Sequence, residues 1–194
     1  MTIKYGNLSQ TFDVRRFGAV GNGVVGVDGS VTGTDNTTAI QAAIDACRAQ
    51  GGGRIFFPYD TTGVYAFDSP LTTGATDISK GLKFTGEGGL TWSFPFDQRK
   101  MVSSIVYRGS GASSAIACGN STGITFENLW LTTQGSNTQN TTISFDGSAK
   151  ITADIGIRDI SLKNVHAFGA NGYSARLTSV VGLSWIGGGI YPAG

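Results

Sequence analysis

The fold is decided by three segments: FDVRRFGAVGNG at residues 12–23, TDNTTAIQAAIDAC at residues 34–47 and GGGRIFFP at residues 51–58. Their order predicts a strand, a glycine turn, an amphipathic helix, a triple glycine and a second strand. No other segment of the chain has a long helical pattern. Because strand-like segments follow, we expect this helix to cap one end of a β structure.

The ends and the buried face of the helix can be predicted. Asp35 is expected to be its N-cap, because a carboxylate accepts hydrogen bonds from the free amides of a first helical turn. Gly51 is expected to take the left-handed conformation that ends helices, before a turn into residues 54–57. The buried face is predicted from helical spacing to consist of Ile40, Ala43, Ile44 and Cys47.

The composition indicates a single structural domain rich in strands and turns. The chain has 194 residues, of which 30 are glycine, and 14% of its residues are charged. Average globular proteins have about 7% glycine and about 25% charged residues. The glycines have no three-residue period, which excludes a collagen. We expect residues 1–75 to form the N-terminal strand, turn and capping-helix region, and residues 76–194 to form repeating strands.

Charge and cysteine usage exclude several classes of function. The formal net charge is +1 and no basic run is present, so nucleic acid is not an expected partner. No segment is apolar for long enough to insert into a membrane, and the first residues contain no apolar signal segment. Cys47 and Cys118 lie in apolar surroundings and are predicted to be buried free thiols. No metal-ligand spacing or cofactor motif is present, so neither metal nor cofactor is expected.

The second half of the chain contains a repeat. Residues 123–129, 159–165 and 182–188 align apolar on apolar and turn residue on turn residue, and residues 81–86 are a weaker copy. Each unit is a short alternating strand that ends in asparagine or glycine. The spacing between units varies, which is typical of a solenoid with insertions.

Stacking of these units as parallel strands, about 4.8 Å apart, predicts which side chains meet. We call a column of side chains at equivalent positions of successive units a ladder. Asparagine tolerates the unusual backbone angles of a turn, so one ladder of asparagines is expected at the turn that ends each strand. The expected ladders are Ile124–Ile160–Leu183 and Phe126–Leu162–Trp185 facing inward, Asn128–Asn164 at the turn, and Thr125–Ser161–Ser184 and Glu127–Lys163 facing outward.

The first eighty residues resemble the N-terminal segment of the pectate-lyase-3-like group of right-handed parallel β-helix proteins, found in phage tailspikes and pectin-degrading enzymes. The shared pattern is Phe-Gly-Ala, Gly-x-Gly, an acidic and threonine-rich helix start, an Ala-Ile-Gln-x-Ala-Ile helix, and a glycine run before Phe-Pro. It lies at residues 17–19, 21–23, 35–38, 39–44, 51–53 and 57–58. The chain departs from the pattern by an insertion at residues 24–33 and by Asn22, where aspartate is commoner. The resemblance implies an all-β fold, a right-handed parallel β-helix (solenoid) with an N-terminal capping α-helix.

The resemblance does not imply one activity, because the group contains polysaccharide lyases, glycoside hydrolases and non-catalytic stalks. Hydrolysis would need two carboxylates about 5–9 Å apart. Lyase chemistry would need a base, and cations beside a substrate carboxylate. The candidate acids are Glu87, Glu127, Asp97, Asp146, Asp154 and Asp159, and the candidate cations are Arg158, Lys163 and Arg176. Solvated surface groups are the favoured interpretation, although Asp154 and Asp159 flank one strand-like segment. The catalytic residues are therefore left unassigned.

The single histidine and four aromatic residues each have two interpretations. His166 has no serine or cysteine placed as a nucleophile, which favours a structural histidine. Trp92, Phe94, Phe96 and Trp130 could stack on sugar rings, and a role in the core or between subunits is the alternative.

The sequence ends with residues 187–194, soon after the last repeat begins, and contains no amphipathic helix there that could cover the last coil. Terminal coils of a solenoid need a cover, so we expect further chain or a partner there. These observations lead to the hypothesis of a homotrimeric phage-type tailspike or tail-fibre protein of the virion tail, which attaches to a host surface polysaccharide and could depolymerise it. The alternatives are a secreted polysaccharide lyase or glycoside hydrolase of the pectin-degrading type, and a non-catalytic structural adaptor of a tail or baseplate.

Overall fold

The computed structural model describes residues 10–26, 30–74, 79–87, 103–109, 114–119, 121–134, 141–146, 157–168, 175–178 and 180–191. These residues form one α-helix, one short 3-10 helix and sixteen strands. The strand pairs among them are parallel, except for one antiparallel pair of two-residue strands. The prediction of an all-β protein with one helix is therefore confirmed.

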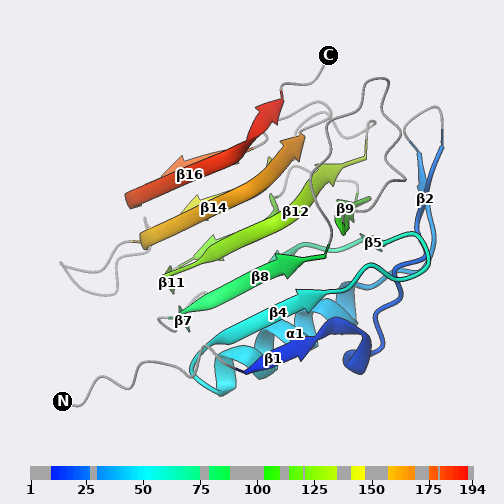
Figure 1. Ribbon diagram of the computed structural model, residues 1–194, viewed down its shortest axis with the longest axis horizontal. Coiled ribbons are helices and arrows are strands. Elements are labelled where there is room, and N and C mark those ends of the chain that lie inside the picture. Colours follow the sequence, from blue (N-terminus) through cyan, green and yellow to red (C-terminus); the bar gives the residue numbers. More distant parts are fainter. Residues whose placement is uncertain are drawn as a thin grey trace.

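The central sheet joins strands that are far apart in the sequence (Figure 1). One register runs through it: Phe12 pairs with Ile55, and the column continues through Phe84, Phe126, Leu162 and Trp185. The strands in spatial order are β1 (Thr11–Asp13), β4 (Gly53–Phe57), β8 (Leu82–Gly86), β12 (Thr125–Thr133), β14 (Ile157–Phe168) and β16 (Val180–Tyr191).

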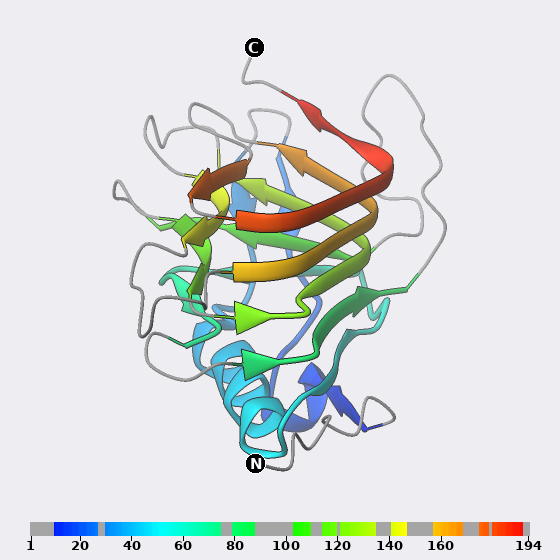
Figure 2. The ribbon, with the colours of Figure 1, turned by 90° about the vertical axis from the view of Figure 1, so that its left-hand side faces the viewer.

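Shorter strands accompany the central sheet and form a second sheet (Figure 2). The chain visits them in the same order each time, so that β4, β5, β6 and β7 are followed by β8, β9, β10 and β11. The second half of β12 pairs with β9 (Ser104–Tyr107), and β9 pairs on its other edge with β5 (Val64–Phe67). The second sheet contains β6 (Leu71–Thr72), β10 (Ser114–Gly119), β13 (Thr141–Asp146) and β15 (Ala175–Thr178). Two further short strands belong to the central sheet: β7 (Ser79–Lys80) pairs with β11 (Ser121–Thr122), and β11 pairs with the start of β14.

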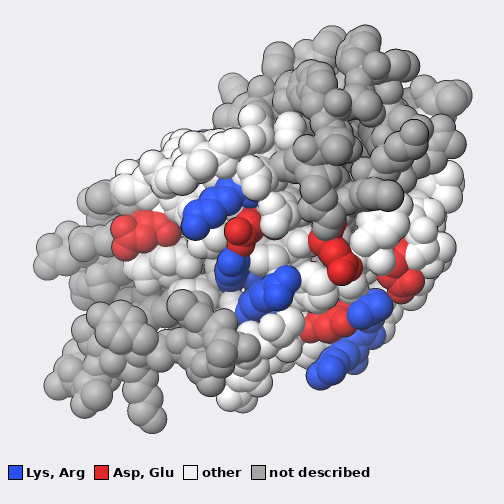
Figure 3. Space-filling model, in the orientation of Figure 1, with Lys and Arg blue, Asp and Glu red and all other residues white. Residues whose placement is uncertain are grey.

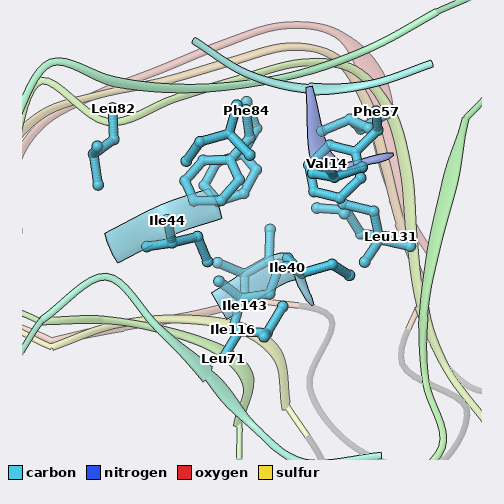
Figure 4. Close-up of a cluster of buried hydrophobic side chains, with 14 of the residues drawn as sticks. Val14, Ile40, Ile44, Phe57, Leu71, Leu82, Phe84, Ile116, Leu131 and Ile143 are labelled. Atoms are coloured by element: carbon cyan, nitrogen blue, oxygen red, sulfur yellow. The ribbon is translucent and has the colours of Figure 1, made fainter. Parts of the chain in front are cut away.

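Side chains from both sheets fill one core (Figure 4). The rings of Phe84 and Phe126 stack 4.6 Å apart with an interplanar angle of 9°. Ile116 and Ile143 of the second sheet belong to the same buried cluster. The two predicted inward ladders are confirmed in register, but Leu183 at the last strand is 42% exposed because no described strand follows it.

The strands bend at positions where the backbone is left-handed. Asn128 and Asn164 have φ values of 54° and 49°, and the Asn164 side-chain amide donates to Asn128 Oδ1 at 3.2 Å. This confirms the predicted asparagine ladder. A second row of such positions lies at the other end of the same strands, at Gly81, Gly123, Asp159 and Gly182.

Helix α1 (Thr37–Ala49) covers the β1 end of the central sheet, opposite β16 (Figure 2). Its predicted buried face is confirmed, because all four residues are fully buried. Gly51 has the predicted positive φ, 81°. The N-cap prediction is wrong by one residue: Asn36 occupies that position, and Asp35 accepts from the Thr37 amide at 3.0 Å from one residue further out.

Asn36 connects three parts of the chain near the start of α1. Its Oδ1 accepts from the Val20 amide at 2.7 Å. Its Nδ2 lies within hydrogen-bonding distance of the carbonyl oxygens of Val20 at 3.1 Å, Thr34 at 2.9 Å and Ala66 at 2.9 Å. The side chain thereby holds the loop after the 3-10 helix η1 (Val14–Phe17) against β5.

The insertion at residues 24–33 forms a small hairpin from β2 (Val24–Val25) and β3 (Val31–Thr32). Val31 packs with Val64, Ala66 and Val106 in a second buried cluster, on the side of β5 and β9 that faces away from the main core. The insertion therefore covers part of the sheet.

The two cysteines, Cys47 and Cys118, are free and buried, as predicted. Burial raises the pKa of the Cys47 thiol to about 12. Among the described residues, no helix has the length and apolar character that crossing a membrane requires.

Candidate functional site

The side of the central sheet that faces away from the core carries two columns of side chains, which we call the outer face. Because side chains alternate along a strand, these columns flank the buried column that contains Phe84. Neighbouring members of a column lie about 4.8 Å apart. The first column is Thr11, Arg54, Lys83, Thr125, Ser161 and Ser184, and the second is Asp13, Phe56, Thr85, Glu127, Lys163 and Ile186.

Contacts between adjacent strands hold several charged groups of the outer face in place. The Arg54 guanidinium lies 4.3 Å from the centre of the Phe56 ring, and its Nε donates to Thr85 Oγ1 at 2.6 Å. Lys83 Nζ pairs with the Glu127 carboxylate on the next strand. Glu127 lies beside Lys163 in register, as predicted, although the recorded ion pair is with Lys83.

Cations outnumber anions over the middle of the outer face. Arg54, Lys83 and Lys163 face the single carboxylate of Glu127 there. The negative charge of Asp13 at the edge is offset by an ion pair with Arg15 at 2.7 Å, and the hydrogen bond from that guanidinium lowers the pKa of the Asp13 carboxyl. Figure 3 shows basic and acidic side chains alternating across this side of the molecule. The excess of positive charge is thus confined to the middle of the outer face, where it would attract an acidic polymer.

Hydroxyl groups continue the first column beyond the lysine. Thr125, Ser161 and Ser184 occupy successive strands in register. Each hydroxyl can both donate and accept a hydrogen bond. A row of hydroxyls beside fixed cations is a suitable surface for a chain of sugar units.

An aromatic pair lies just past the asparagine bend. The Trp130 indole and the His166 imidazole stack with centroids 5.4 Å apart and an interplanar angle of 15°. His166 is 8% exposed, and burial lowers the pKa of its imidazole from its ordinary value, because it disfavours the charged form.

The described candidate acids have different partners. Glu127 belongs to the outer face, and Glu87 accepts from the Tyr59 amide at 2.8 Å. Asp159 lies at the row of left-handed positions at the other end of the strands. It precedes Lys163 by four residues, and Lys163 is the neighbour of Glu127 in register. Four residues of strand span about 13 Å, more than the separation of a hydrolase pair.

The remaining candidates are located less fully. Asp97, Asp154, Trp92, Phe94 and Phe96 lie outside the described residues. Asp146 and Arg158 are described by their backbone in β13 and β14, and Arg176 is exposed on β15 in the second sheet. No group of three His, Cys, Asp or Glu side chains that could hold a metal ion occurs within the described ranges.

Sequence reasoning missed Arg54, Lys83 and Thr85 as members of this surface. The signal for Lys83 was present, because residues 81–86 align with the later repeats and place Lys83 beside Thr125. Arg54 had no such signal, since its strand follows the helix and matches no repeat.

Comparison with known proteins gave partial similarities. No family model matches the chain. The chain is 38% identical over 77 residues to mannuronan C5-epimerase AlgE3 of Azotobacter vinelandii; the match covers 40% of this chain and 4% of the epimerase. The chain thus spans a small part of that relative.

Two solved structures illustrate the structural similarities. The A-module of mannuronan C-5 epimerase AlgE4 from Azotobacter vinelandii aligns with 94% of this chain and 42% of its own length, at 20% identity and a TM-score of 0.49. ORF18 of Geobacillus virus E2 aligns with 82% of this chain and 31% of its own length, at 16% identity and a TM-score of 0.46.

Proposed function

We propose that this protein binds an acidic polysaccharide along its outer face. The observation that carries the proposal is the pair of fixed cations, Arg54 and Lys83, in one column with the hydroxyls of Thr125, Ser161 and Ser184. The cations would attract carboxylate or sulfate groups, and the hydroxyls would bond to sugar hydroxyls.

The sequence similarity supports the same class of ligand. The matched relative is named for its action on mannuronan, a polymer of uronic acid units. A surface with three cations around one carboxylate suits such a polymer better than a neutral one.

The proposal includes the finer architecture. The strands form a right-handed parallel β-helix, in which residues 1–75 are the capping region and residues 76–194 are the coils. The constant order in which the chain visits its sheets supports a helix of coils. Right-handedness is supported by the rule that parallel strand connections in one sheet are right-handed in about 98% of cases.

The biological setting that we propose is a homotrimeric tailspike or tail fibre of a phage-type virion, which recognises a host surface polysaccharide. The resemblance of residues 12–58 to the pectate-lyase-3-like group supports this setting. Binding is preferred to cleavage because Glu127 is engaged by Lys83 and Glu87 by the Tyr59 amide, so neither carboxylate is without a partner. The alternatives are a secreted lyase or hydrolase and a structural adaptor, and the experiment described next distinguishes them from a binding protein.

The test compares three single substitutions in binding to polymannuronate and to neutral dextran. Lys83→Gln should weaken polymannuronate binding about fivefold, which corresponds to roughly 1 kcal/mol for one surface charge. Glu127→Gln should strengthen it, because it removes the only carboxylate from the middle of the face. Arg176→Gln, on the second sheet, is the control and should change nothing.

Isothermal titration calorimetry at low and high salt measures the affinities, and viscometry of the polymer detects cleavage. Equal effects of Lys83→Gln and Arg176→Gln would contradict the outer face as the site. A fall in viscosity would show an enzyme, and absence of binding to a panel of acidic polysaccharides would favour the adaptor.

A further inference from the structure

Two cations of the outer face cross from the first column to the second in the same way. Arg54 and Lys83 are neighbours in the first column, on β4 and β8. The Arg54 side chain reaches Thr85 in the second column of β8, and the Lys83 side chain reaches Glu127 in the second column of β12. Each cation therefore contacts a second-column side chain that lies one strand further along.

The two contacted side chains differ in charge. Glu127 offers a carboxylate that offsets the charge of Lys83, whereas Thr85 offers a neutral hydroxyl to Arg54. Arg54 forms no ion pair with any other residue that the structure describes. The positive charge of Arg54 thus stays unbalanced at a position where the next strand supplies a carboxylate.

Two contacts fix the guanidinium of Arg54 in one orientation. Its Nε donates to Thr85 Oγ1 at 2.6 Å, and its Cζ lies over the Phe56 ring, 4.3 Å from the ring centre. Thr85 is only 3% exposed, so the acceptor itself is held by its surroundings. A side chain that is already ordered loses less conformational entropy when a ligand binds to it.

The terminal nitrogens of Arg54 are available for such a ligand. Nε is the one nitrogen of this guanidinium that has an acceptor within the described ranges. Nη1 and Nη2 form a planar fork, whose donors match two oxygens of a carboxylate or of a sulfate group. A lysine ammonium carries the same charge but lacks this fixed fork.

We propose that Arg54 anchors the polysaccharide, by donating from Nη1 and Nη2 to two oxygens of one acidic group. Thr85 and Phe56 are positioning residues, because they act through the guanidinium. Lys83 attracts the polymer by its charge, and its ion pair with Glu127 leaves it less able to hold one acidic group. This inference rests on the proposed function and adds which cation recognises the shape of the acidic group.

Substitutions that conserve charge separate the fork from the charge. Arg54→Lys should weaken binding about tenfold, the effect expected from losing one charge-assisted hydrogen bond. Lys83→Arg is the matched control and should change the affinity less than about twofold. Isothermal titration calorimetry with polymannuronate and with dextran sulfate measures both variants. The polymer that Arg54→Lys affects identifies the acidic group as carboxylate or sulfate, and losses with both show that the fork accepts either.

Thr85→Val tests the positioning role. It removes the acceptor for Arg54 Nε and should weaken binding about threefold, because the guanidinium must then be ordered by the ligand. In the Arg54→Lys protein the same substitution should cause no further loss, since no guanidinium remains to be held. Equal losses in both backgrounds would show that Thr85 acts on the fold and not through Arg54, which would overturn the positioning role.

The remaining outcomes distinguish this inference from the proposed function. Unchanged affinity of Arg54→Lys for both polymers would overturn the inference alone, provided that Lys83→Gln still weakens polymannuronate binding. Absence of binding of either polymer to the native protein would overturn both. Urea unfolding adds one more outcome: a loss of stability in Arg54→Lys without a loss of affinity would identify an acid of this chain as the partner of the fork, and would overturn the inference.

Discussion

Replacing Asn36 by alanine should destabilise the protein more than any other single polar substitution near the helix. Asn36 is 1% exposed, and its side chain contacts three segments of backbone. The substitution removes the acceptor for the Val20 amide and the donor to the carbonyl oxygens of Thr34 and Ala66. The helix itself loses nothing, because the Asn36 side chain makes no capping hydrogen bond.

The magnitude follows from what is left without a partner. A buried donor or acceptor that loses its partner costs about 1–3 kcal/mol. The Val20 amide loses the Asn36 side chain, whereas the Ala66 carbonyl keeps the Asn36 backbone amide at 2.9 Å. We therefore expect a loss of about 3 kcal/mol in the free energy of unfolding, a large share of the 5–15 kcal/mol typical of a domain.

Urea unfolding followed by circular dichroism measures this loss. The control is Asn22→Ala, which removes two hydrogen bonds to Thr34, at 3.0 and 3.1 Å, from a half-exposed side chain. Water can replace those bonds, so the control should lose less than about 1 kcal/mol. Equal losses for the two variants, or a loss below about 0.5 kcal/mol for Asn36→Ala, would refute the reasoning.

Asn36→Asp separates the donor from the acceptor. It retains an oxygen for the Val20 amide but places a carboxylate against carbonyl oxygens, which raises the pKa of the new acid above its unfolded value. Its stability should therefore be highest at acid pH and fall as the pH rises through the folded pKa. A variant that is equally stable at pH 4 and pH 7, relative to the wild type, would contradict the assigned donor bonds.

Three further predictions concern the bend, the helix start and the thiols. Asn164→Ala should cost about 1 kcal/mol more than Asn164→Gly in the free energy of unfolding, because φ is 49° at this position. Burial alone would raise the pKa of Asp35, but hydrogen bonds from Thr37 and Asp68 and the Arg108 charge lower it, so Asp35→Asn should destabilise the protein at pH 7 and progressively less as the pH falls below 4. Ellman's reagent at pH 8 should modify neither cysteine in the native protein and both in urea, because burial raises the pKa of each thiol.

Local patterns predicted the elements correctly where periodicity is strong. The spacing of Ile40, Ala43, Ile44 and Cys47 gave the buried face of α1, because helical geometry alone places these residues on one side. The alignment of residues 123–129 with 159–165 predicted the register of β12 and β14, since parallel stacking of identical patterns leaves one arrangement that buries the apolar side chains.

Predictions failed where the outcome depends on distant segments. Asp35 was favoured as the N-cap because its carboxylate suits that role. Asn36 occupies the position instead, because its side chain forms hydrogen bonds with the backbone of Val20 and Ala66. Spacing in the sequence does not show that these two residues lie near the start of the helix. The ion pair of Glu127 with Lys83, and not with Lys163, similarly depends on the two neighbours that the stack provides.

The sequence by itself determined which residues pair and which turn, because alternation and left-handed asparagine or glycine positions are properties of a short segment. Only the tertiary structure decided what those pairs expose. Stacking brings Arg54 and Lys83, 29 residues apart, into one column with the later hydroxyls, and it leaves Leu183 open although its pattern matches Ile160. Exposure depends on whether another strand follows, and no local pattern contains that information.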